Sequence, residues 1–317
     1  MQLFLKNILA LFVGSLVIVF VVVIVLQRSE LLMHGLENIP GNNTSNSPCF
    51  RSKIDHMKKC EPKSDRSTFM IMGSSMALNN ISGRLIENRT GDNVYNISSW
   101  GIKVRQLDSL YRIRGHKNVT NILFAFNNVD FGPKGIVLNY KNIRCCLDDH
   151  FPDAVIAYAS VFNFHTFLED WDFRARNGKR ENMYETIHFD STGSVLLKRQ
   201  NFIINPARWS MNYDTVGFSE FLYGAKYLAA YCALDSVRVC FVYLPTRADL
   251  VTPTLRKQID GVSLAMRREF GPNFIDLSNK KISDTMYCDG LHFFSEGANL
   301  LTGMVIDSLE HRHYVGN

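Results

Sequence analysis

Short apolar segments of strand length alternate along this chain with segments in which apolar residues recur at helical spacing. The strand-like segments are residues 68–72, 93–97, 119–126, 237–244 and 274–277. The helical segments are residues 103–115 and 255–270, and a last helix that we expect Ser295 to cap. Strands that alternate with helices favour a parallel sheet with helices on both of its faces. We therefore expect an α/β fold, a three-layer sandwich of flavodoxin-like type.

The N-terminus carries a long apolar run. Residues 7–26 contain no charged side chain and are overwhelmingly apolar, which is long enough to cross a hydrocarbon core of about 30 Å. A cleaved signal peptide has a shorter apolar core, of about 7 to 15 residues, followed by small residues. This run instead ends in Leu26-Gln27-Arg28. We expect one uncleaved transmembrane helix, with residues 1–28 as the membrane anchor.

The charges that flank the run indicate its orientation. The amino terminus and Lys6 lie before it, whereas Arg28 lies after it and is offset by Glu30. Positive charge favours the cytoplasmic side, so a cytoplasmic N-terminus is expected. The rest of the chain would then be extracytoplasmic, which means periplasmic, cell-surface or lumenal.

The chain is expected to have three parts, of which the anchor is the first. Residues 29–66 form a polar stalk, since 38–66 are rich in Asn, Ser, Pro and Lys and lack apolar periodicity. Residues 67–317 form one domain, in which about 131–235 is a variable insertion or lid region. The formal net charge is +5, and much of the excess positive charge lies in the stalk. A basic segment beside anionic lipid headgroups needs no nucleic-acid partner to explain it. The sequence shows no nucleic-acid motif, and we expect no nucleic-acid partner.

The cysteines give little support for a metal site. The chain has seven, an odd number, and none forms a Cys-x-x-Cys pair, which argues against zinc ribbons and thioredoxin-type motifs. Cys49 and Cys60 could close a short loop in an oxidising compartment, whereas most of the others fall in or beside apolar stretches, as buried free thiols do.

Two short motifs at opposite ends of the domain carry chemistry. The first strand runs into Gly73-Ser74-Ser75, and Asp289-Gly290-Leu291-His292 lies near the end of the chain. A serine on a strand-to-loop turn can act as a nucleophile when a histidine takes its proton and an acid orients that histidine. Each motif alone is also an ordinary turn, and their combination is what points to Ser75, His292 and Asp289.

The expected fold would bring further residues to the same edge. In open parallel sheets, ligands bind beyond the carboxyl ends of the strands, and Ser75, Gly101 and Asn127 all fall there. Gly101 could instead serve only to permit a positive φ. Asn127 could be a strand-end asparagine that caps the loop, and Asn128 is its chief competitor for a role in the site.

With these motifs in place, the chain resembles the SGNH hydrolase superfamily, also called GDSL esterases. The resemblance covers residues 68–312 and rests on four blocks in order, namely Gly73-Ser74-Ser75, Trp100-Gly101, Ala125-Phe126-Asn127-Asn128 and Asp289-Gly290-Leu291-His292. The chain departs from the common pattern at Ser74, where that pattern has Asp, and at Ala125 and Asn128, where it has Gly and Asp. The Gly-Ser-Ser form looks like the membrane-anchored branch associated with cell-envelope acyl transfer.

The resemblance implies a division of roles. Ser75 is the nucleophile, His292 the general base and then acid, and Asp289 the carboxylate that fixes the imidazole. The backbone N–H groups of Ser75 and Gly101 and the side-chain amide of Asn127 would form the oxyanion hole. No metal and no organic cofactor is required.

These observations predict a serine-dependent acyl-ester hydrolase or O-acyltransferase that acts on O-acyl, above all O-acetyl, groups of a cell-surface glycan. A lipid or small-ester esterase is a second possibility. A third is a catalytically silent glycan-binding or assembly subunit that partners a multipass membrane acyltransferase. The aromatic and basic residues of 162–180 are compatible with a lid or acceptor groove, and equally with helices that pack over the core.

Overall fold

The computed structural model describes residues 66–114, 118–132, 188–199 and 215–312, together with positions 12–18, 21, 50, 53, 54, 56, 57, 135, 136, 138, 140, 143 and 147. The chain divides into two compact units, which are treated separately. One comprises residues 1–43 with 155–180, and the other comprises residues 44–154 with 181–317.

In the first unit, the described positions 12–18 and 21 are helical. Among the residues that the structure describes, no helix has the length and apolar character needed to cross a bilayer. The predicted span of residues 7–26 lies mostly outside these residues. The membrane anchor therefore stays a prediction.

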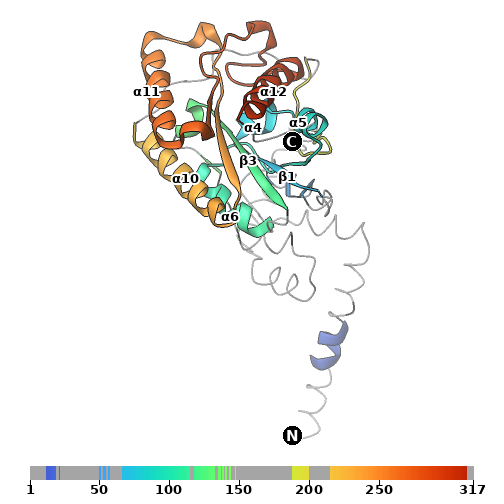
Figure 1. Cartoon of the computed structure of the whole chain (residues 1–317). Coiled ribbons are helices and arrows are strands. Elements are labelled where there is room, and N and C mark those ends of the chain that lie inside the picture. The colour runs from blue at the N-terminus through green and yellow to red at the C-terminus, as the bar shows by residue number, and fades with distance from the viewer. Residues whose placement is uncertain are drawn as a thin grey trace, which may run out of the picture. The chain divides into compact units, whose positions relative to one another are not determined.

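The second unit is built on one five-stranded sheet. Its strands are β1 (Thr68–Gly73), β2 (Asn93–Asn96), β3 (Val119–Phe126), β4 (Arg238–Tyr243) and β5 (Phe274–Asp276). All four pairings are parallel, and the strand order is β2-β1-β3-β4-β5 (Figure 1). This is the order of flavodoxin-like doubly wound sheets. The predicted α/β fold with a central parallel sheet is confirmed.

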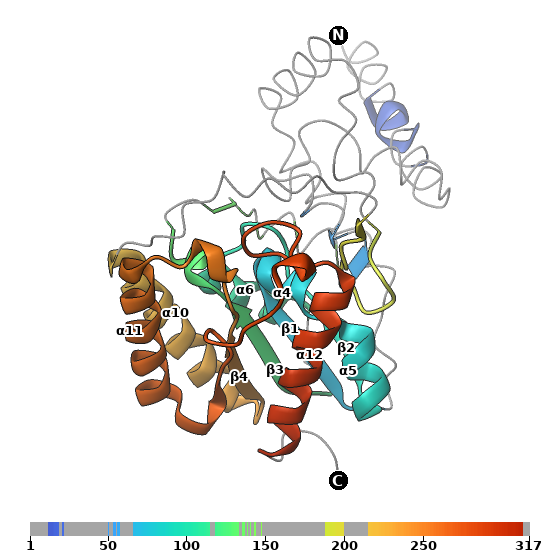
Figure 2. The same cartoon turned by 90° about the horizontal axis from the view of Figure 1, so that it is seen from above.

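Helices cover both faces of the sheet (Figures 1 and 2). On one face lie α4 (Ser75–Asn80), α5 (Gly83–Thr90) and α12 (Ser295–Glu310), and α12 contacts both of the others. On the other face lie α6 (Val104–Arg114), α10 (Thr215–Leu234) and α11 (Pro253–Phe270). The N-cap of α12 is Phe294, and Ser295 is the first helical residue, so the predicted cap is wrong by one position.

An aromatic cluster fills the space between the sheet and α10. Phe126 of β3 stacks on Tyr243 of β4 with ring centroids 5.0 Å apart, and it lies 4.7 Å from Phe221 of α10. Phe131 contacts Phe221 at 4.9 Å from the 3-10 helix η1 (Asn128–Phe131). Each buried ring contributes about 1.5 to 3 kcal/mol of hydrophobic free energy. The cluster fixes η1 against the carboxyl ends of β3 and β4.

The predicted stalk and the predicted variable region both contribute residues to the hydrophobic core of the second unit. Phe50, Ile54 and Met57, within the predicted stalk, are fully or almost fully buried in it, and the Tyr95 hydroxyl donates to the Met57 carbonyl over 3.2 Å. These residues therefore belong to the folded unit. Helix α10, within the predicted variable region 131–235, packs against α6 and β4.

Candidate active site

A sharp turn follows β1 and presents Ser75. Gly73 has a φ of +145°, and a Cβ there would lie 2.4 Å from the Ala125 carbonyl oxygen of β3 and 2.7 Å from the Ala77 Cβ. Only glycine fits this close approach. Ser74 then acts as the N-cap of α4, since its hydroxyl accepts a hydrogen bond from the Met76 N–H over 3.2 Å. Ser75 is thereby placed as the first residue of the helix.

The structure brings together the three side chains that the sequence predicted. The Ser75 Oγ lies 2.8 Å from the His292 Nε2, across 217 residues of sequence. The His292 Nδ1 lies 2.7 Å from the Asp289 Oδ2. An imidazole protonated on Nδ1 donates to Asp289 and leaves Nε2 to accept from the Ser75 hydroxyl. This arrangement suits proton removal from a serine nucleophile.

Asp289 is held in its ionised form. Its Oδ1 accepts from the backbone N–H groups of Leu291 and His292 over 2.7 and 2.8 Å, while its Oδ2 faces the imidazole. Burial alone would raise the pKa of this carboxyl, but hydrogen bonds from the imidazole and the two N–H groups, with the charge of His292, bring it below its usual value. A charged Asp289 stabilises the imidazolium that forms when His292 accepts a proton.

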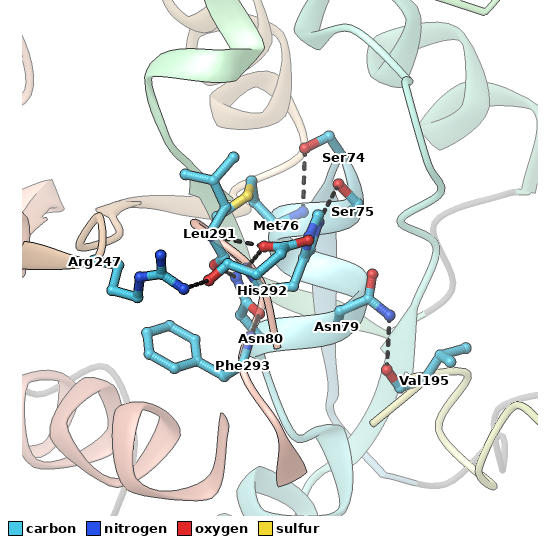
Figure 3. Close-up of polar contacts among 11 residues, drawn as sticks. Ser74, Ser75, Met76, Asn79, Asn80, Val195, Arg247, Leu291, His292 and Phe293 are labelled. Atoms are coloured by element: carbon cyan, nitrogen blue, oxygen red, sulfur yellow. Dashed lines mark hydrogen bonds and ion pairs between the residues drawn. The ribbon is translucent and has the colours of Figure 1, made fainter. Parts of the chain in front are cut away.

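Two further side chains hold the loop that carries the histidine. The Asn80 amide, at the end of α4, donates to the Leu291 carbonyl over 3.0 Å and accepts from the Phe293 N–H over 2.9 Å (Figure 3). The Arg247 guanidinium donates to the Asp289 carbonyl over 3.3 Å and forms a two-pronged ion pair with Asp249. The loop is therefore attached both to α4, which begins at Ser75, and to the segment after β4.

The backbone N–H groups of Ser75 and Gly101 are the first two predicted oxyanion donors. Neither the Ser75 N–H nor the Gly101 N–H donates to a group within the described ranges. Gly101 adopts a φ of +70°, and its carbonyl accepts from the Ile136 N–H over 3.0 Å. These features suit donors that await a substrate oxygen, and the oxyanion role of both residues stays a prediction.

The Asn127 side chain, the third predicted donor, has partners within the protein. Its amide nitrogen donates to the Leu244 carbonyl over 2.8 Å and lies 3.2 Å from the Thr246 hydroxyl. Asn128 bonds through its Oδ1 to the Tyr243 hydroxyl. To bind an oxyanion, Asn127 would have to exchange its contact with Thr246 for one with the substrate.

Two charged residues that the motifs did not predict, Asp130 and Lys103, also lie in this region. The Asp130 Oδ2 accepts from the Asn127 N–H over 2.8 Å. Lys103 donates to the carbonyls of Asp130 and Gly132 over 3.1 and 2.6 Å. The available signal was the spacing Asn127-x-x-Asp130, which is that of a helix-capping pair.

The remaining predictions concern the lid or acceptor groove, the cysteines and metal binding. Residues 162–180, considered as a lid or acceptor groove, fall outside the described residues. Of the cysteines, Cys232, Cys240 and Cys288 are buried and form no disulfide among the described residues. No group of three or more His, Cys, Asp or Glu side chains that could hold a metal ion occurs in the part of the chain that the structure describes.

Comparison with known proteins gives distant structural likenesses only. Neither a protein-family model nor a curated protein matches the chain. Among solved structures, the chain is similar to the acetyl xylan esterase Est2A from the rumen bacterium Butyrivibrio proteoclasticus, at 9% sequence identity and a TM-score of 0.37. The match covers 80% of this chain and 66% of that one.

Proposed function

We propose that this protein is a serine-dependent acyl-ester hydrolase or O-acyltransferase of SGNH type. The observation that carries the proposal is the continuous chain of contacts from the Ser75 Oγ through the His292 ring to the Asp289 carboxylate, at 2.8 and 2.7 Å. A binding subunit has no need of a serine, a histidine and an acid held in this geometry.

The proposed reaction has two halves. The Ser75 Oγ attacks the ester carbonyl carbon while the His292 Nε2 takes the hydroxyl proton, and negative charge develops on the carbonyl oxygen. The alcohol then leaves with the proton returned by His292, and an acyl-Ser75 ester remains. Water or an acceptor hydroxyl attacks this ester by the same route, so hydrolysis and transfer differ only in the second nucleophile.

The proposed substrate is an O-acyl group, above all an O-acetyl group, of a cell-surface glycan. The motifs that resemble the membrane-anchored branch of the SGNH superfamily and the apolar run at residues 7–26 support it. A lipid or small ester is the alternative substrate class, since a fold does not determine the substrate.

A fluorophosphonate probe tests the proposal directly. We expect a covalent adduct on Ser75 and not on Ser74, because the Ser75 Oγ bonds to the imidazole whereas the Ser74 Oγ caps α4. Peptide mapping of the labelled full-length protein would locate the adduct. Ser75→Ala and His292→Ala should abolish labelling, and Asp289→Asn should weaken it severely by favouring the wrong tautomer.

Ser308→Ala is a suitable control, because that hydroxyl bonds to the Met304 carbonyl over 2.8 Å on α12 and has no part in the site. It should label like the wild type. A folded wild-type protein that stays unmodified, while a known serine esterase reacts in parallel, would favour the silent-subunit alternative.

A further inference from the structure

Lys103 lies between the two loops that carry Gly101 and Asn127, two of the predicted oxyanion donors. It stands two residues after Gly101, and its ammonium donates to the carbonyls of Asp130 and Gly132 over 3.1 and 2.6 Å. Asp130 belongs to η1, the turn for which Asn127 is the N-cap. One lysine side chain therefore joins the loop after β2 to the turn after β3.

The turn after β3 is held together as one unit that includes Asn127. The Asn127 N–H donates to the Asp130 Oδ2 over 2.8 Å, and the Asp130 N–H donates to the Asn127 carbonyl over 2.9 Å. These two hydrogen bonds fix Asn127 and Asp130 relative to each other. The contact that holds the Asp130 carbonyl therefore also bears on the position of Asn127.

The loop after β2 is held against the turn that carries the proposed nucleophile. The Ser99 N–H donates to the Gly73 carbonyl over 3.3 Å, and Gly73 lies two residues before Ser75. Lys103 is anchored in the same loop through its backbone, since its N–H donates to the Gln106 Oε1 over 2.8 Å. The base of the lysine side chain is thus fixed on the Ser75 side, and its ammonium is fixed on the turn after β3.

We infer that Lys103 is a positioning residue of the oxyanion hole. Its ammonium holds the turn that carries Asn127 in place relative to Gly101, and so sets where the donors lie around the substrate oxygen. Oxyanion donors act only when they are aimed at the position that the oxygen will occupy, so a small displacement of one turn lowers the rate. This inference rests on the proposed function and extends it to the residue that organises the donors.

The surroundings of Lys103 suit a fixed side chain. Gly135 packs on its aliphatic stem, since a Cβ at position 135 would lie 2.9 Å from the Lys103 Cγ. The charged groups that act on the ammonium are Asp130, Arg105 of α6 and Glu220 of α10. Burial lowers the pKa of Lys103, Asp130 and Glu220 oppose this change, and Arg105 adds to it. A charged donor makes stronger hydrogen bonds to carbonyls than a neutral one does.

Replacement of the ammonium in the full-length protein tests the inference. Lys103→Met keeps most of the stem and removes the donors. We expect it to lower kcat on p-nitrophenyl acetate about 10-fold with KM within about 3-fold of the wild type, because oxyanion donors act mainly in the transition state. Lys103→Arg keeps a charged donor and should restore kcat to within about 3-fold of the wild type.

A double-mutant cycle shows whether Lys103 acts through Asn127. If it does, removal of the ammonium should cost little once the Asn127 amide is gone. The variant with both Lys103→Met and Asn127→Ala should then stay within about 3-fold of Asn127→Ala alone. A lysine that only stabilised the fold would lower kcat by the same factor in both backgrounds, and that result would overturn the inference.

Lys226→Met is the matched control, because it removes an exposed ammonium of α10 that pairs with Glu269 of α11 over 2.8 Å. It should leave kcat and KM unchanged. Circular dichroism and thermal unfolding would show that each variant is folded.

Should Lys103→Met fail to fold, Lys103→Gln supplies a neutral amide on a side chain that is one bond shorter. It should lower kcat as well, since it cannot hold both carbonyls as the ammonium does. A folded Lys103→Gln variant with wild-type kcat would overturn the inference.

Two results separate the two proposals. A Lys103→Met variant with wild-type kcat and KM would overturn the role of Lys103 and leave the proposed function standing. A wild-type protein inert to both p-nitrophenyl acetate and the fluorophosphonate probe would overturn both proposals.

Discussion

Asn127 is the residue whose predicted role and observed contacts differ most. As an oxyanion donor its loss should lower turnover about 10²- to 10³-fold, although its amide nitrogen contacts Leu244 and Thr246 in the free protein. We expect Asn127→Ala to show that loss in kcat, with the Ser75 adduct still forming slowly. Steady-state kinetics on p-nitrophenyl acetate would measure it.

Asn128→Ala provides the comparison, because Asn128 is the neighbouring candidate and bonds to the Tyr243 hydroxyl. Asn128→Ala should affect stability more than kcat. If Asn127→Ala turns over normally and Asn128→Ala is impaired, the role belongs to Asn128.

The side chains that meet around Ser75 were only partly predictable from the sequence. The proposed nucleophile, base and acid follow from two short motifs, because a serine, a histidine and an acid must meet to act in this way. Arg247 and Asn80 act through backbone carbonyls of the histidine loop, at Asp289 and Leu291. A contact with a backbone carbonyl places no demand on the type of the residue contacted, so it leaves no pattern in the sequence.

At the scale of elements, the strand-to-helix turn after β1 depends on Gly73. A Cβ at this position would lie 2.4 Å from the Ala125 carbonyl oxygen, and the φ of +145° is one that other residues rarely adopt. We expect Gly73→Ala to lower the free energy of unfolding by about 2 kcal/mol or more, from backbone strain and overpacking. Urea unfolding followed by circular dichroism would measure it.

Gly261→Ala is the matched control. Gly261 lies within α11, and a Cβ there would meet no atom within 4 Å. Because alanine has the higher helix propensity, this variant should gain up to about 1 kcal/mol. Equal destabilisation by the two substitutions would contradict the steric argument for Gly73.

The helices that the sequence did not predict lack a clear pattern of apolar residues. Helix α4 has only six residues, and its start is set by the Ser74 cap rather than by periodicity. Helix α10 is apolar on its buried and exposed sides alike, since Tyr223 and Leu234 are 74% and 80% exposed. Apolar residues show a helical period in the sequence only when the helix also has a polar face. The sequence of α11 therefore predicts a helix, whereas that of α10 does not.

At the scale of the molecule, the sequence predicted the class of the fold but not the strand order. Alternation of strands and helices implies a parallel sheet. Each crossover, however, can place the next strand on either side of the previous one. Here β3 returns to the free edge of β1, opposite β2, so the strand order reverses at β1, the strand that Ser75 follows.

The placement of the whole chain in the cell is the last prediction. The uncharged run at residues 7–26, with Lys6 before it, predicts a membrane anchor whose C-terminal side is extracytoplasmic. Protease added to intact cells or spheroplasts should therefore digest the residues after about position 66, as followed with an antibody to the C-terminal region. A cytoplasmic protein probed in the same samples should stay intact, and detergent should expose both. Protection of the domain in both intact cells and spheroplasts, with digestion only after detergent, would exclude a periplasmic or cell-surface domain and leave a cytoplasmic or a lumenal one.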